Sequence, residues 1–229
     1  MEAREAHSTQ PPGGRYILPP SKLSPEDILF CIDVDPECLI EMKNTSVTGR
    51  PFTRLECIKQ GILLFLHAKL AVNQDHRFAY CALGKSPFWL KKEFSSEVDS
   101  AIAAFRGITV DSSAGHADLT HLFKVANHEA KKSRAQNRIL RVILLYCRSS
   151  VAPHHQWPVS QKLFTFDVVY LHDKPGPDNC PQKVYDGLVD ALEQRCGQDD
   201  IDIPKSLTKK PPVVDLTPSD QECVPVSSQ

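Results

Sequence analysis

Short apolar runs that alternate with segments of helical periodicity constrain the fold of this chain more than any other feature. Residues 28–32 form a continuous apolar run that ends at Asp33, as is typical of a strand buried on both faces. Similar runs occupy residues 78–83, 139–146 and 164–171, and helical spacing marks residues 55–70, 101–105, 119–126 and 184–192. This alternation predicts an α/β fold with a Rossmann-like layout, a mostly parallel sheet and helices on both faces.

Local signals predict where several of these elements begin and end. Pro51 suits the first turn of the helix over residues 55–70. Residues 88–90 read as an antiparallel edge strand that ends in charged residues. Residues 96–99 resemble a capping box for the next helix, which Gly107 would stop. Asp118 is the expected cap of the helix over residues 119–126.

The ends of the chain differ from its middle in composition. Ten of the 18 prolines lie in residues 1–27 and 204–229. We therefore expect disordered, Pro-rich tails at residues 1–25 and 195–229 around one folded domain at residues 26–194. No signal-peptide core or membrane-spanning segment is present in this sequence, and the eight cysteines form no CxxC pair, so we expect a protein of the cytoplasm or nucleus.

Motifs for catalysis are absent from the sequence. It contains no GxGxxG, GxxxxGK[ST] or GxSxG pattern, so we expect no enzyme, no catalytic residue and no cofactor. An α/β enzyme with an unfamiliar site remains the weakest alternative. The near balance of 27 basic against 28 acidic residues, and the lack of aromatic residues within the basic stretch 124–141, argue against nucleic-acid binding.

The loop after the first strand carries three carboxylates within five residues. Asp33, Asp35 and Glu37 are hard oxygen ligands of the kind that Mg²⁺ and Ca²⁺ prefer. The simpler interpretation is that Asp33 braces the loop while the other two side chains are solvated. Short acidic motifs match many chains without a metal, and we favour the simpler interpretation.

The strand that ends at Asp33, the long helix after it and the run Phe-Asp-Val-Val-Tyr-Leu-His at residues 166–172 resemble one family. It is the BRISC and BRCA-one-A complex member one family, von Willebrand factor A-like scaffold subunits, in a plant-like version, and the resemblance spans residues 26–194. It implies a non-catalytic scaffold in complexes that cleave lysine-63-linked ubiquitin in DNA repair and signalling. It further implies two partners, a ubiquitin-conjugating-enzyme-like subunit and a metalloprotease deubiquitinase subunit, and a location in nucleus and cytoplasm.

Von Willebrand A domains usually carry a metal-ion-dependent adhesion site, which this sequence matches poorly. The DxSxS motif of that site reads Asp-Val-Asp-Pro-Glu at residues 33–37, and Arg148 follows the strand over residues 139–146. A degenerate site around Asp33, Asp35 and Ser112 is what remains, so no metal is expected. The alternative is a metal-dependent, ligand-binding von Willebrand A domain that uses these three residues.

The resemblance also bears on the contact surface and on the end of the domain. We expect partner contacts from the loop over residues 170–174 and from the helix over residues 184–192, with Tyr170, His172, Lys174, Val184 and Leu188 as candidates. After that helix the sequence becomes acidic and then Pro-rich. A final βα unit of the fold is therefore expected to be missing, which would leave an edge strand and a helix face uncovered.

Overall fold

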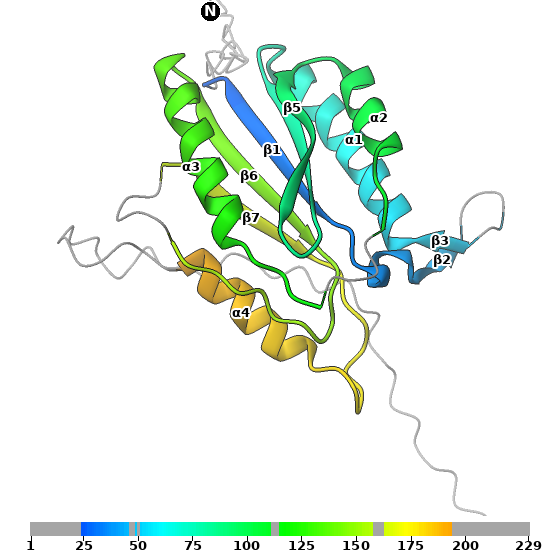
Figure 1. Ribbon diagram of the computed structural model, residues 1–229. Coiled ribbons are helices and arrows are strands. Elements are labelled where there is room, and N and C mark those ends of the chain that lie inside the picture. Colours follow the sequence, from blue (N-terminus) through cyan, green and yellow to red (C-terminus); the bar gives the residue numbers. More distant parts are fainter. Residues whose placement is uncertain (1–23, 46–48, 50, 111–114, 158–162, 194–229) are drawn as a thin grey trace, which may run out of the picture. The chain divides into compact units, whose positions relative to one another are not determined.

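A five-stranded sheet with the strand order β5-β4-β1-β6-β7 lies at the centre of the domain (Figure 1). Its strands are β1 (Glu26–Asp33), β4 (Arg77–Leu83), β5 (Pro87–Ser95), β6 (Ile139–Tyr146) and β7 (Thr165–Tyr170). Four of them run parallel, and only β5 pairs antiparallel, with β4. The predicted mostly parallel α/β sheet is confirmed, as is the antiparallel direction of the strand around residues 88–90.

The computed structural model describes residues 24–45, 49, 51–110, 115–157 and 163–193. All of them belong to one compact unit. The tails predicted to be disordered lie almost wholly outside the described residues. Within the described part, no helix is both long and apolar enough to cross a bilayer.

Helices cover both faces of the sheet, as predicted. They are α1 (Arg54–Val72), α2 (Val98–Arg106), α3 (Thr120–Ala135) and α4 (Pro181–Glu193). Alternate side chains of β1 point to opposite sides: Ile28 and Phe30 join the core beneath α1 and α2, whereas Leu29 and Cys31 join the core beneath α3 and α4. This two-sided burial explains the continuous apolar run of β1, because neither face of the strand meets water.

The segment before α1 differs from the sequence prediction. A 3₁₀ turn (η1, Pro36–Leu39) and a two-stranded hairpin of β2 (Glu41–Thr45) and β3 (Pro51–Thr53) replace the expected turns. Pro51 therefore opens β3 and is not in the first turn of α1. The helix starts one turn later, where Thr53 and Glu56 form a capping box.

Two other helix starts show how weak the local signals are. The capping box predicted at residues 96–99 is absent, since α2 is preceded by Glu97 with no side-chain cap. Gly107 does follow the end of α2, as predicted. The N-cap of α3 is Leu119 and not the predicted Asp118, although the Thr120 N–H donates a hydrogen bond to the Asp118 carboxylate at 2.8 Å.

The two edges of the sheet are built differently. The pairing of β5 with β4 shifts register twice, and β5 carries Lys91 and the exposed Lys92. At the opposite edge β7 pairs with β6 without a shift and, among the described residues, has no outer neighbour. The prediction that a final βα unit is missing concerns residues 195–229, which lie outside the described residues.

A buried carboxylate holds the amino-terminal ends of the strands together. Asp27 is 1% exposed and accepts hydrogen bonds from Arg77 Nε at 2.8 Å, Arg138 Nε at 2.7 Å and Ser133 Oγ at 2.7 Å. Burial alone would raise the pKa of Asp27, but the hydrogen bonds from Arg77, Ser133 and Arg138 outweigh it and lower that pKa below its ordinary 3.8. Asp27 thereby links β1 to β4 and to the loop after α3 by charge, and to α3 itself by the hydrogen bond from Ser133.

We expect Asp27→Asn to lower the free energy of unfolding at pH 7 by about 3 kcal/mol, because two arginines lose a buried partner. The folded pKa of Asp27 is depressed, so its stabilisation is complete above pH 3.8 and is lost as the pH falls toward the folded pKa. Urea unfolding at pH 7 and pH 3 should show a smaller gap between parent and variant at pH 3. The exposed Asp99→Asn is the control, and an equal gap at both pH values would contradict the prediction.

Candidate functional site

A buried ion pair occupies the carboxyl edge of the sheet, where α/β folds bind their ligands. Asp33 ends β1 and Arg148 follows β6, and both side chains are 0% exposed. Arg148 Nη2 donates to Asp33 Oδ1 at 3.0 Å, and Arg148 Nε donates at 3.1 Å. Arg148 Nη2 also donates to the carbonyl oxygens of Leu83 at 3.3 Å and Gly84 at 2.7 Å, which attaches the end of β4 to the pair.

The charges of this pair depend on each other. Burial raises the pKa of Asp33, and the guanidinium of Arg148 only partly opposes that rise. Burial lowers the pKa of Arg148, but the Asp33 carboxylate outweighs it, so that pKa lies above its ordinary value. Asp33 also accepts the backbone N–H groups of Asp35 and Cys147. The carboxylate that the alternative interpretation would use as a metal ligand thus has a guanidinium as its positive partner.

The other two carboxylates of the acidic loop are engaged in bracing that loop. Asp35 Oδ1 accepts the Glu37 N–H at 3.0 Å and caps η1. The Glu37 carboxylate accepts the Ser149 N–H at 2.9 Å. Of the residues predicted for a degenerate adhesion site, the structure brings Asp33 and Asp35 together, whereas Ser112 lies outside the described residues. Within the part described, no three His, Cys, Asp or Glu side chains are placed to hold one metal ion.

The loop after β7 is fastened to the same edge. The Tyr170 hydroxyl donates to the carbonyl oxygen of Arg148 at 3.1 Å, and the Asp173 N–H donates to Ser149 Oγ at 2.9 Å. Arg54, only 3% exposed, bridges from α1 to the Asp173 carboxylate and to the carbonyl oxygen of Cys147. The three loops that follow β1, β6 and β7 therefore form one connected surface.

Sequence reasoning missed Arg54, which connects these loops. A cation in the first turn of a helix is disfavoured by the helix dipole, and that misplaced charge was the available signal. Its partners Glu37, Cys147 and Asp173 are far away in sequence, so only the folded sheet reveals why an arginine stands there.

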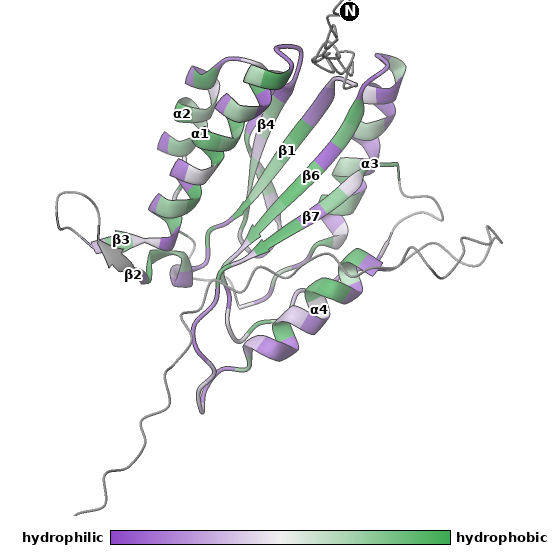
Figure 2. Ribbon diagram, turned by 180° about the vertical axis from the view of Figure 1, so that it is seen from behind, coloured by the Kyte–Doolittle hydropathy of each residue, from purple (hydrophilic) through white to green (hydrophobic). Residues whose placement is uncertain are grey.

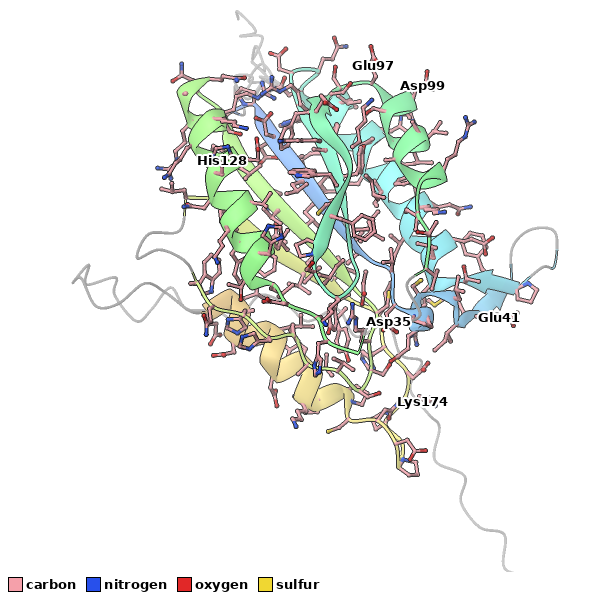
Figure 3. The ribbon with its side chains drawn as sticks, viewed as in Figure 1. Asp35, Glu41, Glu97, Asp99, His128 and Lys174 are labelled. Atoms are coloured by element: carbon pink, nitrogen blue, oxygen red, sulfur yellow. The ribbon has the colours of Figure 1, made fainter. Side chains whose placement is uncertain are left out.

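The five predicted contact residues divide into two groups. His172 and Lys174 are exposed, Tyr170 is half-buried, and Figure 3 places Lys174 at the same edge as Asp35. Val184 and Leu188 are 0% and 2% exposed, because they lie on the face of α4 that packs against the sheet. The prediction that these two side chains lie on the contact surface is therefore corrected, and α4 presents the 40% exposed Tyr185 instead.

Removing the Arg148 guanidinium should destabilise the folded domain. We expect Arg148→Met to reduce the free energy of unfolding by about 3–5 kcal/mol, since it leaves the Asp33 charge buried without its partner. Adding Asp33→Asn to this variant should recover a large part of that loss, because the uncompensated charge is removed. Urea unfolding of the parent, both single variants and the double variant measures the coupling, and additive losses would contradict it.

Comparison with known proteins points to one group of relatives. A scan against protein-family models finds no match. Curated proteins named "BRISC and BRCA1-A complex member 1" match, among them that of Xenopus laevis, 22% identical over 203 residues, which cover 82% of this chain and 61% of the relative. That of Homo sapiens is 24% identical over 170 residues, covering 69% of this chain and 51% of the relative. The chain thus spans only one half to three fifths of these relatives' length.

Solved structures resemble the fold at a lower level. One is described as "Crystal Structure of the SpRpn10 VWA domain", with TM-score 0.36 and 14% identity over 77% of this chain and 100% of that one. Another is the "TFIIH p34 N-terminal Domain", with TM-score 0.41 and 13% identity over 65% of this chain and 82% of that one. Because both TM-scores are below 0.5, the fold assignment rests on the strand order and helix layers described above. The sequence relatives confirm the resemblance: this chain is similar to the BRISC and BRCA1-A complex member 1 proteins.

Proposed function

We propose that this protein is a non-catalytic scaffold subunit of a BRISC- or BRCA1-A-like multi-protein complex. Two observations together support the proposal. The relatives are named as complex members, and at the carboxyl edge of this chain a buried guanidinium partners the carboxylate on which an adhesion-site metal would depend. The charged groups at this edge hold the loops to one another. A surface that is fixed in this way is able to recognise a partner by its shape.

The finer assignment follows the resemblance. The complex would act on lysine-63-linked ubiquitin in DNA repair and signalling, in nucleus and cytoplasm. A metalloprotease subunit would carry the catalytic zinc, and a ubiquitin-conjugating-enzyme-like subunit would be the direct neighbour of this chain. We assign this chain the role of holding such subunits in place.

The loop over residues 170–174 is the proposed contact surface. Tyr170 and Asp173 fasten it to the loop after β6, so it does not have to be ordered when a partner binds. His172 and Lys174 are exposed on it. An exposed side chain on a braced backbone adds contact area at little entropic cost, which is the property that a scaffold surface needs.

The alternative, a metal-dependent ligand-binding domain, has a specific obstacle. A divalent cation beside Asp33 would have to displace Arg148, which also bonds two carbonyl oxygens and has no exposed surface. Titration calorimetry of the chain with Mg²⁺ or Mn²⁺ separates the two functions. We expect no saturable heat, whereas micromolar binding that Asp33→Ala abolishes would establish the alternative.

Affinity capture of the full chain from its own cells tests the scaffold role. We expect a metalloprotease and a ubiquitin-conjugating-enzyme-like protein to be recovered together by mass spectrometry. The double variant His172→Ala, Lys174→Glu should reduce their recovery by roughly tenfold, as for loss of central interface contacts.

The matched control is Lys92→Glu, which reverses an exposed lysine on the opposite edge strand β5. It should leave the recovery unchanged. Capture of the parent chain without these two subunits would refute the proposed function. Equal loss in the control and the loop variant would refute the loop as the contact surface.

A further inference from the structure

The outer side of α3 carries a row of basic side chains. Lys124, His128 (labelled in Figure 3) and Lys131 are exposed and follow the spacing i, i+4, i+7. They therefore lie on one side of the helix and extend over about 10 Å, and we call them the basic stripe. Glu129 is the one carboxylate of this fully described helix. It is 7% exposed and pairs with Lys132 at 2.9 Å, so the outer side of α3 presents no free negative charge.

The outer side of α4 carries a row of carboxylates with the same spacing. Asp186, Asp190 and Glu193 are exposed and again stand at i, i+4 and i+7, and we call them the acidic stripe. The Asp190 side chain is 67% exposed and contacts His155 Nε2 at 3.3 Å. In this fully described helix the one cation is Lys183, which precedes the stripe by about one turn. The two stripes thus match in length and spacing and are opposite in charge.

Both stripes belong to one face of the domain. The buried sides of α3 and α4 join the same core on the same side of the sheet (Figure 1). In Figure 2 each of the two helix ribbons changes between green and purple along its length, as amphipathic helices do. Since the apolar sides pack inward, the two stripes lie on the outward side of one helical layer. We call this surface the α3–α4 face.

The charges of the α3–α4 face are left largely without partners in a single copy. No described carboxylate forms an ion pair with Lys124 or Lys131, and no described cation forms one with Asp186 or Glu193. By contrast, the arginines at the two ends of the sheet all have carboxylate partners, as Arg148 does. The stripes on α3 and α4 therefore take no part in the ion pairs that hold the domain together.

A second copy of the chain carries the complement of both stripes at once. A two-fold axis brings the same surface patch of two copies together, so that residue i meets residue j and residue j meets residue i. With α3 of each copy against α4 of the other, each basic stripe meets an acidic stripe, and this contact occurs twice. The formal net charge of −1 means that overall charge hardly repels two copies.

Tyr185 supplies an apolar contact beside the acidic stripe. It precedes Asp186 on α4 and is 40% exposed. Tyrosine is enriched among the residues that contribute most to protein interfaces. The long hydrocarbon stems of Lys124 and Lys131 are able to pack on such a ring while their ammonium groups reach the carboxylates. The face therefore offers buried area as well as charge.

We propose that the α3–α4 face binds a second copy of this chain about a two-fold axis, with the basic stripe of each copy on the acidic stripe of the other. The inference goes beyond the proposed function and does not depend on it, because it concerns the association of the chain with itself. The contacts lie between surface charges, so salt should weaken them. Raising the ionic strength from about 0.15 M to about 1 M shortens the screening length from about 8 Å to about 3 Å.

Sedimentation equilibrium of the full chain with charge-reversed variants tests the proposal. We expect the parent to form dimers that dissociate in high salt. One variant, Lys124→Glu with Lys131→Glu, reverses the basic stripe, and another, Asp186→Lys with Glu193→Lys, reverses the acidic stripe. Each alone should dimerise at least about tenfold more weakly, because like charges then face each other. An equimolar mixture of the two variants should restore dimers that contain one copy of each, since both contacts are again complementary.

Matched controls separate the α3–α4 face from net charge. The variant Lys92→Glu with Arg106→Glu changes the net charge as much as reversal of the basic stripe, on exposed residues of β5 and α2, and should dimerise as the parent does. The variant Glu97→Lys with Asp99→Lys does the same for the acidic stripe (Figure 3). Mixed with the variant that has a reversed basic stripe, it keeps one repulsive contact and should give fewer mixed dimers than the complementary pair.

Three results would overturn the proposal. The first is a parent chain that stays monomeric up to about 0.1 mM, where a dissociation constant in the micromolar range would be saturated. The second is a parent dimer that neither stripe reversal weakens, which would place the contact on another surface. The third is an equimolar mixture of the two reversed variants that stays monomeric although the parent forms dimers.

Discussion

The Asp33–Arg148 pair is the interaction on which the carboxyl edge of this domain depends. Both charges are buried, so neither side chain tolerates loss of the other. Through carbonyl and amide contacts the pair joins the ends of β1, β4 and β6, and Arg54 and Tyr170 connect the loop after β7 to them. The positive charge that balances Asp33 is therefore supplied by the chain itself, from the loop after β6.

The order and type of the main elements could be predicted from the sequence, because the spacing of its apolar residues matches the positions that are buried in the structure. The runs that became β1, β4 and β6 are strands whose side chains are buried almost throughout, whereas β7 alternates between buried and exposed side chains. The period of α1 has the same physical origin, since its apolar residues lie in the core beneath it. The hairpin of β2 and β3 was not predictable in this way. It is short, and its pairs join residues 12, 10 and 6 positions apart, with Met42 opposite Phe52 as its one pair of large apolar residues.

The candidate site was only partly predictable for a related reason. Arg148 was identified as incompatible with an adhesion site, but its contact with Asp33 spans more than a hundred residues and appears only when β1 and β6 pair. Val184 and Leu188 have the helical period of a docking face, which is also the period of a helix that covers its own sheet. Periodicity shows that a face is apolar, and the tertiary structure decides what covers it.

The unequal edges of the sheet bear on how an assembly around this domain would grow. At β5 the lysines and the two shifts of register obstruct the addition of a further strand. At β7 the pairing is regular and the adjacent face is open. Among the described residues, β7 is therefore the edge that leaves room for a further strand, and the lysines and register shifts of β5 leave the opposite edge closed to one.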